Sequence, residues 1–289
     1  MVNVDKPYLN RDGNLSMKNS NEWANPSTAG ADQQESMFMH LEDRARCTDQ
    51  HAVNSAFMGI LDPQPGEQLL EVGCGSGVLC RQAVRGMDLA RKITGIDISF
   101  SFVNAAQGIV NEAKLAPKIN FSTGAAENLP FAGQEFDAVF AARLLLHAAD
   151  PGDVVKEMVR VVKHSGRVVV MDWDYDTVVV DHPDRELTRR LIHWRTDHRG
   201  GDNWSGRKLF RIMAEAGLRD LHLDPVVSIA RSERDSLTQS LWHAAQGARD
   251  QAVITPEEYE AWTGELQAAM KAGYYYASIL YFVVSGKRE

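Results

Sequence analysis

Leu69-Leu70-Glu71-Val72-Gly73-Cys74-Gly75-Ser76-Gly77 is the stretch of sequence that decides the fold. A short apolar run suited to a buried strand leads directly into three glycines at alternating positions, and a helical pattern follows. Glycine lets the backbone turn sharply and pass close to a ligand, and the next helix presents free N–H groups at the same place. A tight turn that binds nothing is the alternative interpretation. The stretch therefore predicts a strand–loop–helix unit that could hold a ligand.

The spacing of these glycines distinguishes between classes of nucleotide-binding protein. The dinucleotide fingerprint is Gly-x-Gly-x-x-Gly, whereas this chain reads Gly-x-Gly-x-Gly and has Val78 where the third glycine of the fingerprint would stand. The pattern therefore argues against an NAD or FAD enzyme.

Strands alternate with helices from Gln68 to Asp172, and the alternation loosens after Asp172. The expected strands are Gln68–Val72, Ile93–Ile98, Ile119–Ser122, Phe136–Ala141, Arg167–Asp172, Leu221–Ile229 and Ile279–Ser285. Such alternation predicts parallel strands, right-handed crossovers and helices on both faces of the sheet. The expected fold class is α/β, with a Rossmann-like, doubly wound, mostly parallel seven-stranded sheet and helical cap insertions.

The regions that lack this alternation of strands and helices indicate the domain organisation. Residues 1–36 are rich in Asn, Ser, Asp and Gly without an apolar period, which predicts a flexible N-terminal arm. Residues 37–289 are expected to form one domain, whose helical pattern begins at Met37 and runs towards Leu61. The helices expected at about 176–217 and 231–273 interrupt the alternation and are interpreted as insertions that cap the sheet.

Composition excludes several classes of function. The net charge is −8 and no Lys/Arg block occurs, which argues against a nucleic-acid partner. No apolar stretch approaches the ~20 residues that a membrane span requires, and the N-terminus lacks a secretory pattern. The three cysteines are Cys47, Cys74 and Cys80, an odd number without metal-ligand spacing, so we expect reduced thiols, no metal and a cytoplasmic protein.

Asp97 adds specificity to the glycine loop. It ends the second expected strand, where a carboxylate can accept hydrogen bonds from both ribose hydroxyls of a nucleoside that lies across the sheet edge. Alone, it could equally cap the helix that follows. A glycine loop together with an acid at the end of the next strand is more specific than either feature alone.

Four motifs in this order resemble class I S-adenosylmethionine-dependent methyltransferases: EVGCGSG at 71–77, GID at 95–97, GAAENLPF at 124–131 and FDAV at 136–139. The resemblance is closest to the small-molecule type exemplified by the ubiquinone/menaquinone methyltransferases and covers about residues 68–172 and the closing strand. It implies S-adenosyl-L-methionine as cofactor and methyl transfer to a small organic metabolite by in-line displacement. A protein or tRNA methyltransferase, or a non-catalytic cofactor-binding partner of another enzyme, is the alternative.

The resemblance also implies which residues bind the cofactor. The glycine loop would pack against its methionine and ribose parts, Asp97 would bind the ribose, and later residues would border the adenine and the sulfur. The implied set is Gly73, Cys74, Gly75, Gly77, Asp97, Ile98, Ala126, Glu127, Ala142 and Arg143. One position departs from the family, because Ala125 stands where this subgroup usually has Asp. Arg143 could instead form a surface or inter-loop ion pair.

The reaction requires mainly alignment and exclusion of water, and a base only where the nucleophile must lose a proton. The candidate bases are His147 and Asp172, although a structural histidine and a capping aspartate are the alternatives. Trp173 and Tyr175 are expected to form walls of the acceptor site, unless they belong to the core. The expected partner is a small-molecule acceptor, without nucleic acid or membrane, and a homodimer is left open.

Several arginines gather between residues 185 and 211 of this acidic chain. Their two interpretations are a preference for an anionic acceptor and a solvated helix face. The arginines are Arg189, Arg190, Arg195, Arg199, Arg207 and Arg211.

Overall fold

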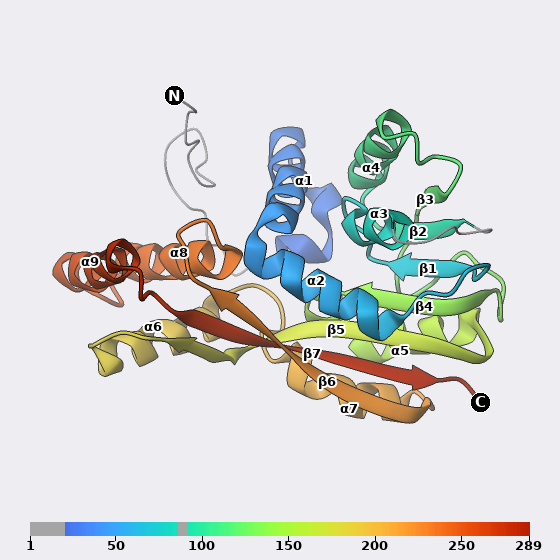
Figure 1. Ribbon diagram of the computed structural model, residues 1–289. Coiled ribbons are helices and arrows are strands. Elements are labelled where there is room, and N and C mark those ends of the chain that lie inside the picture. The colour runs from blue at the N-terminus through green and yellow to red at the C-terminus, as the bar shows by residue number, and fades with distance from the viewer. Residues whose placement is uncertain (1–20, 86–91) are drawn as a thin grey trace.

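The computed structural model describes residues 21–85 and 92–289, in which helices cover both faces of a central sheet (Figure 1). Within these residues the sheet has seven strands in the order β3-β2-β1-β4-β5-β7-β6. The strands are β1 (Leu69–Val72), β2 (Ile93–Asp97), β3 (Ile119–Thr123), β4 (Phe136–Ala142), β5 (Val162–Val180), β6 (Arg219–Ala230) and β7 (Ala277–Lys287). The predicted α/β class and seven-stranded sheet are confirmed.

The expectation of a mostly parallel sheet is wrong, because the sheet is mixed. β1, β2, β3, β4 and β5 pair in parallel, but β7 is antiparallel to both of its neighbours, β5 and β6. The physical reason lies in the connection before β7. Ala230, which ends β6, pairs with Ala277, which begins β7, so residues 231–276 leave and re-enter the sheet at the same end. A connection that does not cross the sheet reverses the strand direction.

Nine helices accompany the sheet in the described part of the chain: α1 (Ala31–Arg46), α2 (Thr48–Leu61), α3 (Val78–Arg85), α4 (Phe100–Glu112), α5 (Pro151–Val161), α6 (Arg185–His198), α7 (Ser205–Glu215), α8 (Ser236–Asp250) and α9 (Pro256–Ala272). None of them is long and apolar enough to cross a membrane. Their ends have local causes. Asp150 caps α5 by accepting from the N–H groups of Gly152 and Asp153, and Thr255 and Glu258 form a reciprocal capping box on α9.

Two apolar clusters form the core, one on each face of the sheet. Successive strand residues alternate between them, so Leu69 belongs to the cluster with α2 and α3, whereas Leu70 belongs to the cluster with α5 and α7. Figure 1 shows α5 and α7 beneath the sheet and α1, α2, α3 and α4 above it. Burial on both faces explains why the central strands are continuously apolar.

β5 is much longer than the expected strand Arg167–Asp172. Its last pair with β4 is Met171 with Ala142, and beyond this point it continues alongside β7 alone as far as Val180. The acids of the sequence DWDYD suggested a strand end, but they alternate with apolar residues at the strand period of two. Trp173 therefore lies on the face of Met171, while Asp172 and Asp174 point towards α7.

The segment 1–36 is only partly described, and the predicted flexible arm remains a prediction. Residues 21–36 contain two short 3-10 helices, η1 (Glu22–Ala24) and η2 (Pro26–Thr28), and the beginning of α1. The helical pattern expected from Met37 forms two helices, because the chain is extended at Cys47. The two expected insertions contain the end of β5, α6 and α7, and then α8 and α9. Of these, α7 packs with α5 on one face of the sheet, and the capping role of the others remains a prediction.

Candidate functional site

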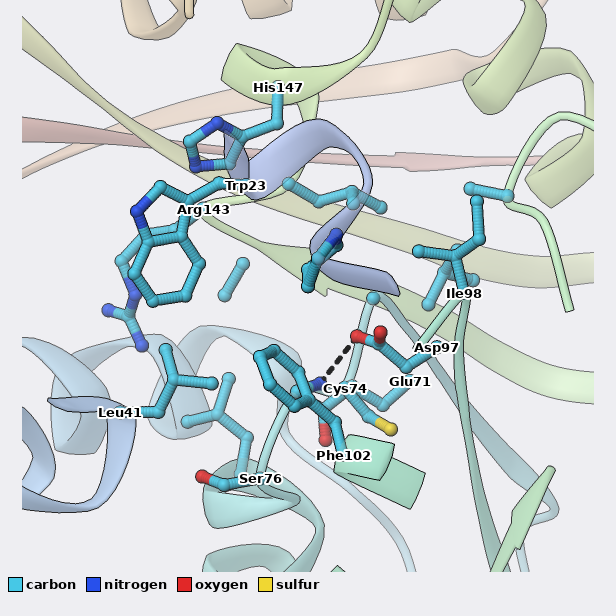
Figure 2. Close-up of a pocket in the computed structure, with 18 of the residues that line it drawn as sticks. Trp23, Leu41, Glu71, Cys74, Ser76, Asp97, Ile98, Phe102, Arg143 and His147 are labelled. Carbon is cyan, nitrogen blue, oxygen red and sulfur yellow. Dashed lines mark hydrogen bonds between the residues drawn. The ribbon is translucent and has the colours of Figure 1, made fainter. Parts of the chain in front are cut away.

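A cavity of about 150 Å³ lies at the carboxyl ends of β1, β2 and β4 (Figure 2). Ligands in open α/β sheets bind at this edge. Of the residues predicted from the sequence, those that line the cavity are Gly73, Cys74, Gly75, Asp97, Ile98, Ala126, Glu127, Ala142, Arg143, His147 and Trp173. Gly77, Asp172 and Tyr175 do not line it. The structure thus brings together most of the predicted positions.

Other lining residues were not predicted. Several of them come from η1, α1, α2 and the end of α6, which lie far from the motifs in the sequence and meet them only in the folded chain. The most polar or aromatic of them are Trp23, His40, Arg44, Gln50, Asn54 and Arg199. Trp23 and Leu41 are drawn in Figure 2 on the opposite side of the cavity from Asp97 and Ile98.

The glycine loop has the backbone conformation that its sequence predicted. Gly73, Gly75 and Gly77 all have positive φ, at 69°, 52° and 74°. A Cβ on Gly77 would collide with the ring of Phe121, so this glycine serves packing behind the loop rather than the cavity. A Cβ on Gly75 would lie 2.8 Å from Cδ1 of Leu41, a side chain of α1. The loop therefore brings its backbone against the cavity at Gly73 and Gly75.

Asp97 links this loop to the end of β2. Its Oδ2 accepts a hydrogen bond of 2.8 Å from the N–H of Gly75, and its Oδ1 accepts one of 2.9 Å from the N–H of Ser99 (Figure 2). Burial raises the pKa of Asp97, and these backbone hydrogen bonds oppose that change. Each carboxylate oxygen keeps acceptor capacity beyond these bonds. The carboxylate thus holds the loop and remains able to accept from a ligand.

Glu71 is a lining acid to which the sequence assigned no role of its own. Its Oε2 accepts from the backbone N–H of Cys80 at 3.0 Å and from Cys80 Sγ at 2.9 Å. Burial raises the pKa of Glu71 to about 7. In the sequence, Glu71 is simply one residue of the glycine-loop motif. Only the folded structure shows that its carboxylate is buried at the base of the cavity.

Arg143 follows the end of β4 and has an unusual backbone. Its φ of 59° is positive, and its N–H donates to the carbonyl of Met171 at 2.7 Å. Both Nη atoms donate to Oδ1 of Asn54 at 3.1 Å, whereas the buried Nε has no partner in the described structure. Burial lowers the pKa of Arg143. The alternative of a surface ion pair is wrong, because the guanidinium is buried against a neutral amide.

His147 lines the cavity beneath the N-terminal segment. Its Nδ1 hydrogen bonds to Oδ1 of Asn21 at 2.8 Å, Asn21 returns a bond to the carbonyl of His147, and the ring of Trp23 stacks at 6.2 Å. Burial, with repulsion from Arg199 and Arg44, lowers the pKa of His147 to about 3. The imidazole is therefore neutral and weakly basic here. Its catalytic role remains a prediction.

Asp172 lies behind the cavity wall, on the α7 face of β5. Its Oδ2 accepts from the N–H of Leu146 at 3.1 Å and from Oγ of Ser205 at 2.6 Å, so it joins the turn containing His147 to the beginning of α7. Burial raises the pKa of Asp172 to about 7. A direct catalytic role for Asp172 remains a prediction, and the contacts describe a positioning role.

Trp173 and Tyr175 share one face of β5 but differ in their access to the cavity. Trp173 lines it, whereas Tyr175 is buried with its hydroxyl 2.7 Å from Oγ of Ser240 on α8. Of the two predicted acceptor walls, Trp173 is therefore the one at the cavity surface. Tyr175 is buried behind Trp173, away from the cavity surface.

The raised pKa of Asp172 predicts a pH-dependent stability. Above about pH 4 the unfolded chain has lost the Asp172 proton, whereas the folded protein still holds it. The free energy of unfolding that this difference contributes is therefore fully present below about pH 4 and is lost as pH rises through about 7. The free energy of unfolding of the wild type should fall between pH 4.5 and 6.5 more steeply than that of Asp172→Asn, by up to about 1.4 kcal/mol per pH unit. Urea unfolding across this range is the measurement. Parallel pH profiles would contradict the assignment.

Gly75→Ala tests the backbone of the loop. An alanine at φ 52° costs about 1–2 kcal/mol, and its Cβ would also press on Leu41, so both stability and cofactor affinity should fall. Gly59→Ala in α2 is the matched control, because a Cβ there meets nothing within 4 Å and alanine favours a helix. Urea unfolding and calorimetry with S-adenosylhomocysteine compare the two. Equal stability of both variants would count against a strained turn.

Comparisons with known proteins agree with the motifs. Residues 70–170 match a family model described as a methyltransferase domain. An uncharacterised 37.1 kDa protein in a transposon of Streptomyces fradiae is 28% identical over 192 residues, which cover 66% of this chain and 55% of the relative. The ubiquinone/menaquinone biosynthesis C-methyltransferase UbiE of Geotalea daltonii is 31% identical over 109 residues, which cover 38% of this chain and 46% of the relative. The chain thus spans about half the length of these relatives.

Solved structures share the fold at low identity. The cyclase SpnF superposes with a TM-score of 0.53 at 23% identity, and the match covers 82% of this chain and 80% of that protein. This likeness shows the fold alone. The domain match and the UbiE relative bear out the resemblance to class I S-adenosylmethionine-dependent methyltransferases.

Proposed function

We propose that this chain transfers the methyl group of S-adenosyl-L-methionine to a small organic acceptor, because residues 70–170 match a family model described as a methyltransferase domain. The observation that carries the proposal is the hydrogen bond from the N–H of Gly75 to Asp97, which fixes a glycine loop and a carboxylate side by side at the carboxyl edge of the sheet. Such an edge binds a nucleoside with its ribose at the acid.

The residues present fit this cofactor. Gly73, Cys74 and Gly75 would border its methionine and ribose parts, and Asp97 would accept from the ribose hydroxyls. Ile98 and Glu127, both exposed, would flank the adenine at the mouth of the cavity, with Ala126 beside them. Because Ala125 stands where a carboxylate is usual, backbone groups or another side chain would accept from the adenine amino group.

When bound, S-adenosylmethionine supplies an electrophilic methyl group on a sulfonium. Ala142 and Arg143 would lie along its methionine part, and the work of the protein is to align the acceptor and to exclude water. η1 and α1 contribute to exclusion, because Trp23 and Leu41 cover the cavity. Ligand cavities usually exceed 300 Å³. The smaller volume here supports movement of this cover when cofactor and acceptor enter.

His147 and Trp173 are the proposed acceptor-side residues, with Asp172 and Tyr175 behind them. A neutral imidazole with a pKa of about 3 is a weak base, which favours either an acceptor that is already anionic or one that carries a free lone pair. Gly77 is proposed to support the loop from behind. The proposed reaction does not depend on an oligomeric state, and a homodimer remains a prediction.

Methyl transfer is tested by incubating the chain with methyl-labelled S-adenosylmethionine and a fractionated metabolite extract. The expected result is a labelled small molecule together with stoichiometric S-adenosylhomocysteine. Binding of S-adenosylhomocysteine without labelling of any fraction would favour the non-catalytic alternative, and labelling confined to protein or tRNA would favour the macromolecular one. Since a fold does not determine chemistry, this product is the decisive observation.

A further inference from the structure

We infer that the methyl acceptor carries an anionic group, a carboxylate or a phosphate, which is bound by Arg199 at the side of the cavity away from Asp97. The inference rests on the proposed function and names the class of its substrate. Arg199 follows α6 and lines the cavity beside Trp173 on β5, whereas Asp97 ends β2. β1 and β4 lie between those two strands, so β2 and β5 are about 14 Å apart across the sheet.

The first observation is that two neighbouring guanidinium groups lack acidic partners. Arg195 is only 6% exposed, and its one hydrogen bond goes from Nη2 to Oγ of Ser240 at 3.0 Å. Its buried Nε and Nη1 have no partner among the described residues. Arg199 lies one helical turn further along, and within residues 21–85 and 92–289 it forms no ion pair. Buried cations of this kind are costly unless an anion accompanies them.

The other arginines of this region provide the contrast. Arg190 pairs with Glu258, Arg207 with Asp174 and Arg211 with Glu215. The interpretation as a solvated helix face therefore holds for Arg190 and Arg211, whose side chains are exposed. It is wrong for Arg195, which is buried, and for Arg199, which lines the cavity.

The electrostatics of the cavity point the same way. Burial, with repulsion from Arg195 and Arg44, lowers the pKa of Arg199 to about 9, so it remains protonated at neutral pH. The groups that oppose this change are the hydroxyls of Tyr175 and Tyr281, and no carboxylate is among them. Positive charge is thus concentrated at one side of a cavity in a chain whose net charge is −8.

Aromatic rings hold these guanidinium groups in place. Cζ of Arg199 lies 4.5 Å from the ring centre of Trp173, and Cζ of Arg195 lies 4.9 Å from that of Tyr175. A guanidinium that stacks on a ring by its face keeps its N–H edge for a planar, bidentate contact with a carboxylate or phosphate. Trp173 therefore positions Arg199 and also offers a surface to a planar acceptor.

The experiment measures binding of model anions to the chain saturated with S-adenosylhomocysteine, by calorimetry at constant ionic strength. Benzoate and phenyl phosphate are the anionic probes, and benzamide is the neutral probe of similar shape. At least one anion should bind at least tenfold more tightly than benzamide, and the tighter of the two distinguishes a carboxylate from a phosphate. Arg199→Gln should remove that difference, while Arg199→Lys should retain part of it.

Arg189→Gln is the matched control, since Arg189 is an exposed residue on the same helix, and its affinities should stay within twofold of the wild type. Equal affinity for benzoate, phenyl phosphate and benzamide, or no binding of any of them, would overturn the inference, as would anion binding that survives in Arg199→Gln. Because the same titration first requires S-adenosylhomocysteine to bind, its failure at that step would identify the proposed function, and not the anion site, as wrong.

Discussion

Asp97→Ala is expected to weaken the binding of S-adenosylhomocysteine by at least about 100-fold. Two hydrogen bonds from the ribose to a carboxylate contribute roughly 1.5–3 kcal/mol each, so their loss corresponds to about 3–6 kcal/mol. The variant also frees the N–H groups of Gly75 and Ser99, which now donate to this carboxylate. The glycine loop would then lose both its ligand contact and its anchor. Calorimetry with S-adenosylhomocysteine gives the affinity directly.

Asp97→Asn separates these two effects. The amide can still accept one backbone hydrogen bond but carries no charge, so its affinity should lie between those of the wild type and Asp97→Ala. Circular dichroism and urea unfolding verify that both variants are folded. An affinity within threefold of the wild type in folded Asp97→Ala would remove Asp97 from the cofactor site.

Arg207→Ala is expected to lower the free energy of unfolding by about 3 kcal/mol. Asp174 is 1% exposed on β5, and Arg207 of α7 donates to its carboxylate from both Nε and Nη2. Removal of one partner from a buried ion pair typically costs 3–5 kcal/mol, because the remaining charge is left uncompensated. The partial exposure of Arg207 places the expected value at the lower end. Urea unfolding is the measurement.

Arg211→Ala is the control for this variant on the same helix. Its pair with Glu215 is exposed on both sides, so its removal should cost less than about 0.5 kcal/mol. Introducing Asp174→Asn into Arg207→Ala should recover part of the lost stability, since the buried group is then neutral. If Arg207→Ala and Arg211→Ala lose equal stability, Asp174 is not held as a buried charge.

The part of the site that could be predicted from the sequence is local. Gly73, Gly75 and Asp97 each depend on a short motif at a strand end, where residue type and spacing alone determine the backbone and the acid. The same holds for the seven strands, whose apolar runs are bounded by turns. Local signals of this kind transfer directly from sequence to structure.

The remainder depends on contacts that no short motif encodes. Trp23 and Arg199 reach the cavity from segments that lie more than 100 residues apart, and nothing in their neighbouring sequence marks them as lining residues. The sequence could not show that Asp172 and Trp173 point to opposite faces of one long strand. The extension of β5 beyond β4 depends on pairing with β7, about 110 residues later. The direction of β7 could not be predicted either. It depends on residues 231–276 leaving and re-entering the sheet at the same end.

The insertion of β7 between β5 and β6 has a consequence for the order in which the chain folds. Among the strands of residues 21–85 and 92–289, β6 has only β7 as a neighbour, so it cannot enter the sheet until residues 277–287 have arrived. Closing the loop from Met171 to Val283 brings together residues of large sequence separation, which slows folding. The half of the sheet that carries the glycine loop consists of β1 to β5, all of which precede β6 and β7 in the chain. The half of the sheet that contains β6 and β7 must therefore form last, and these two strands should dock as a unit.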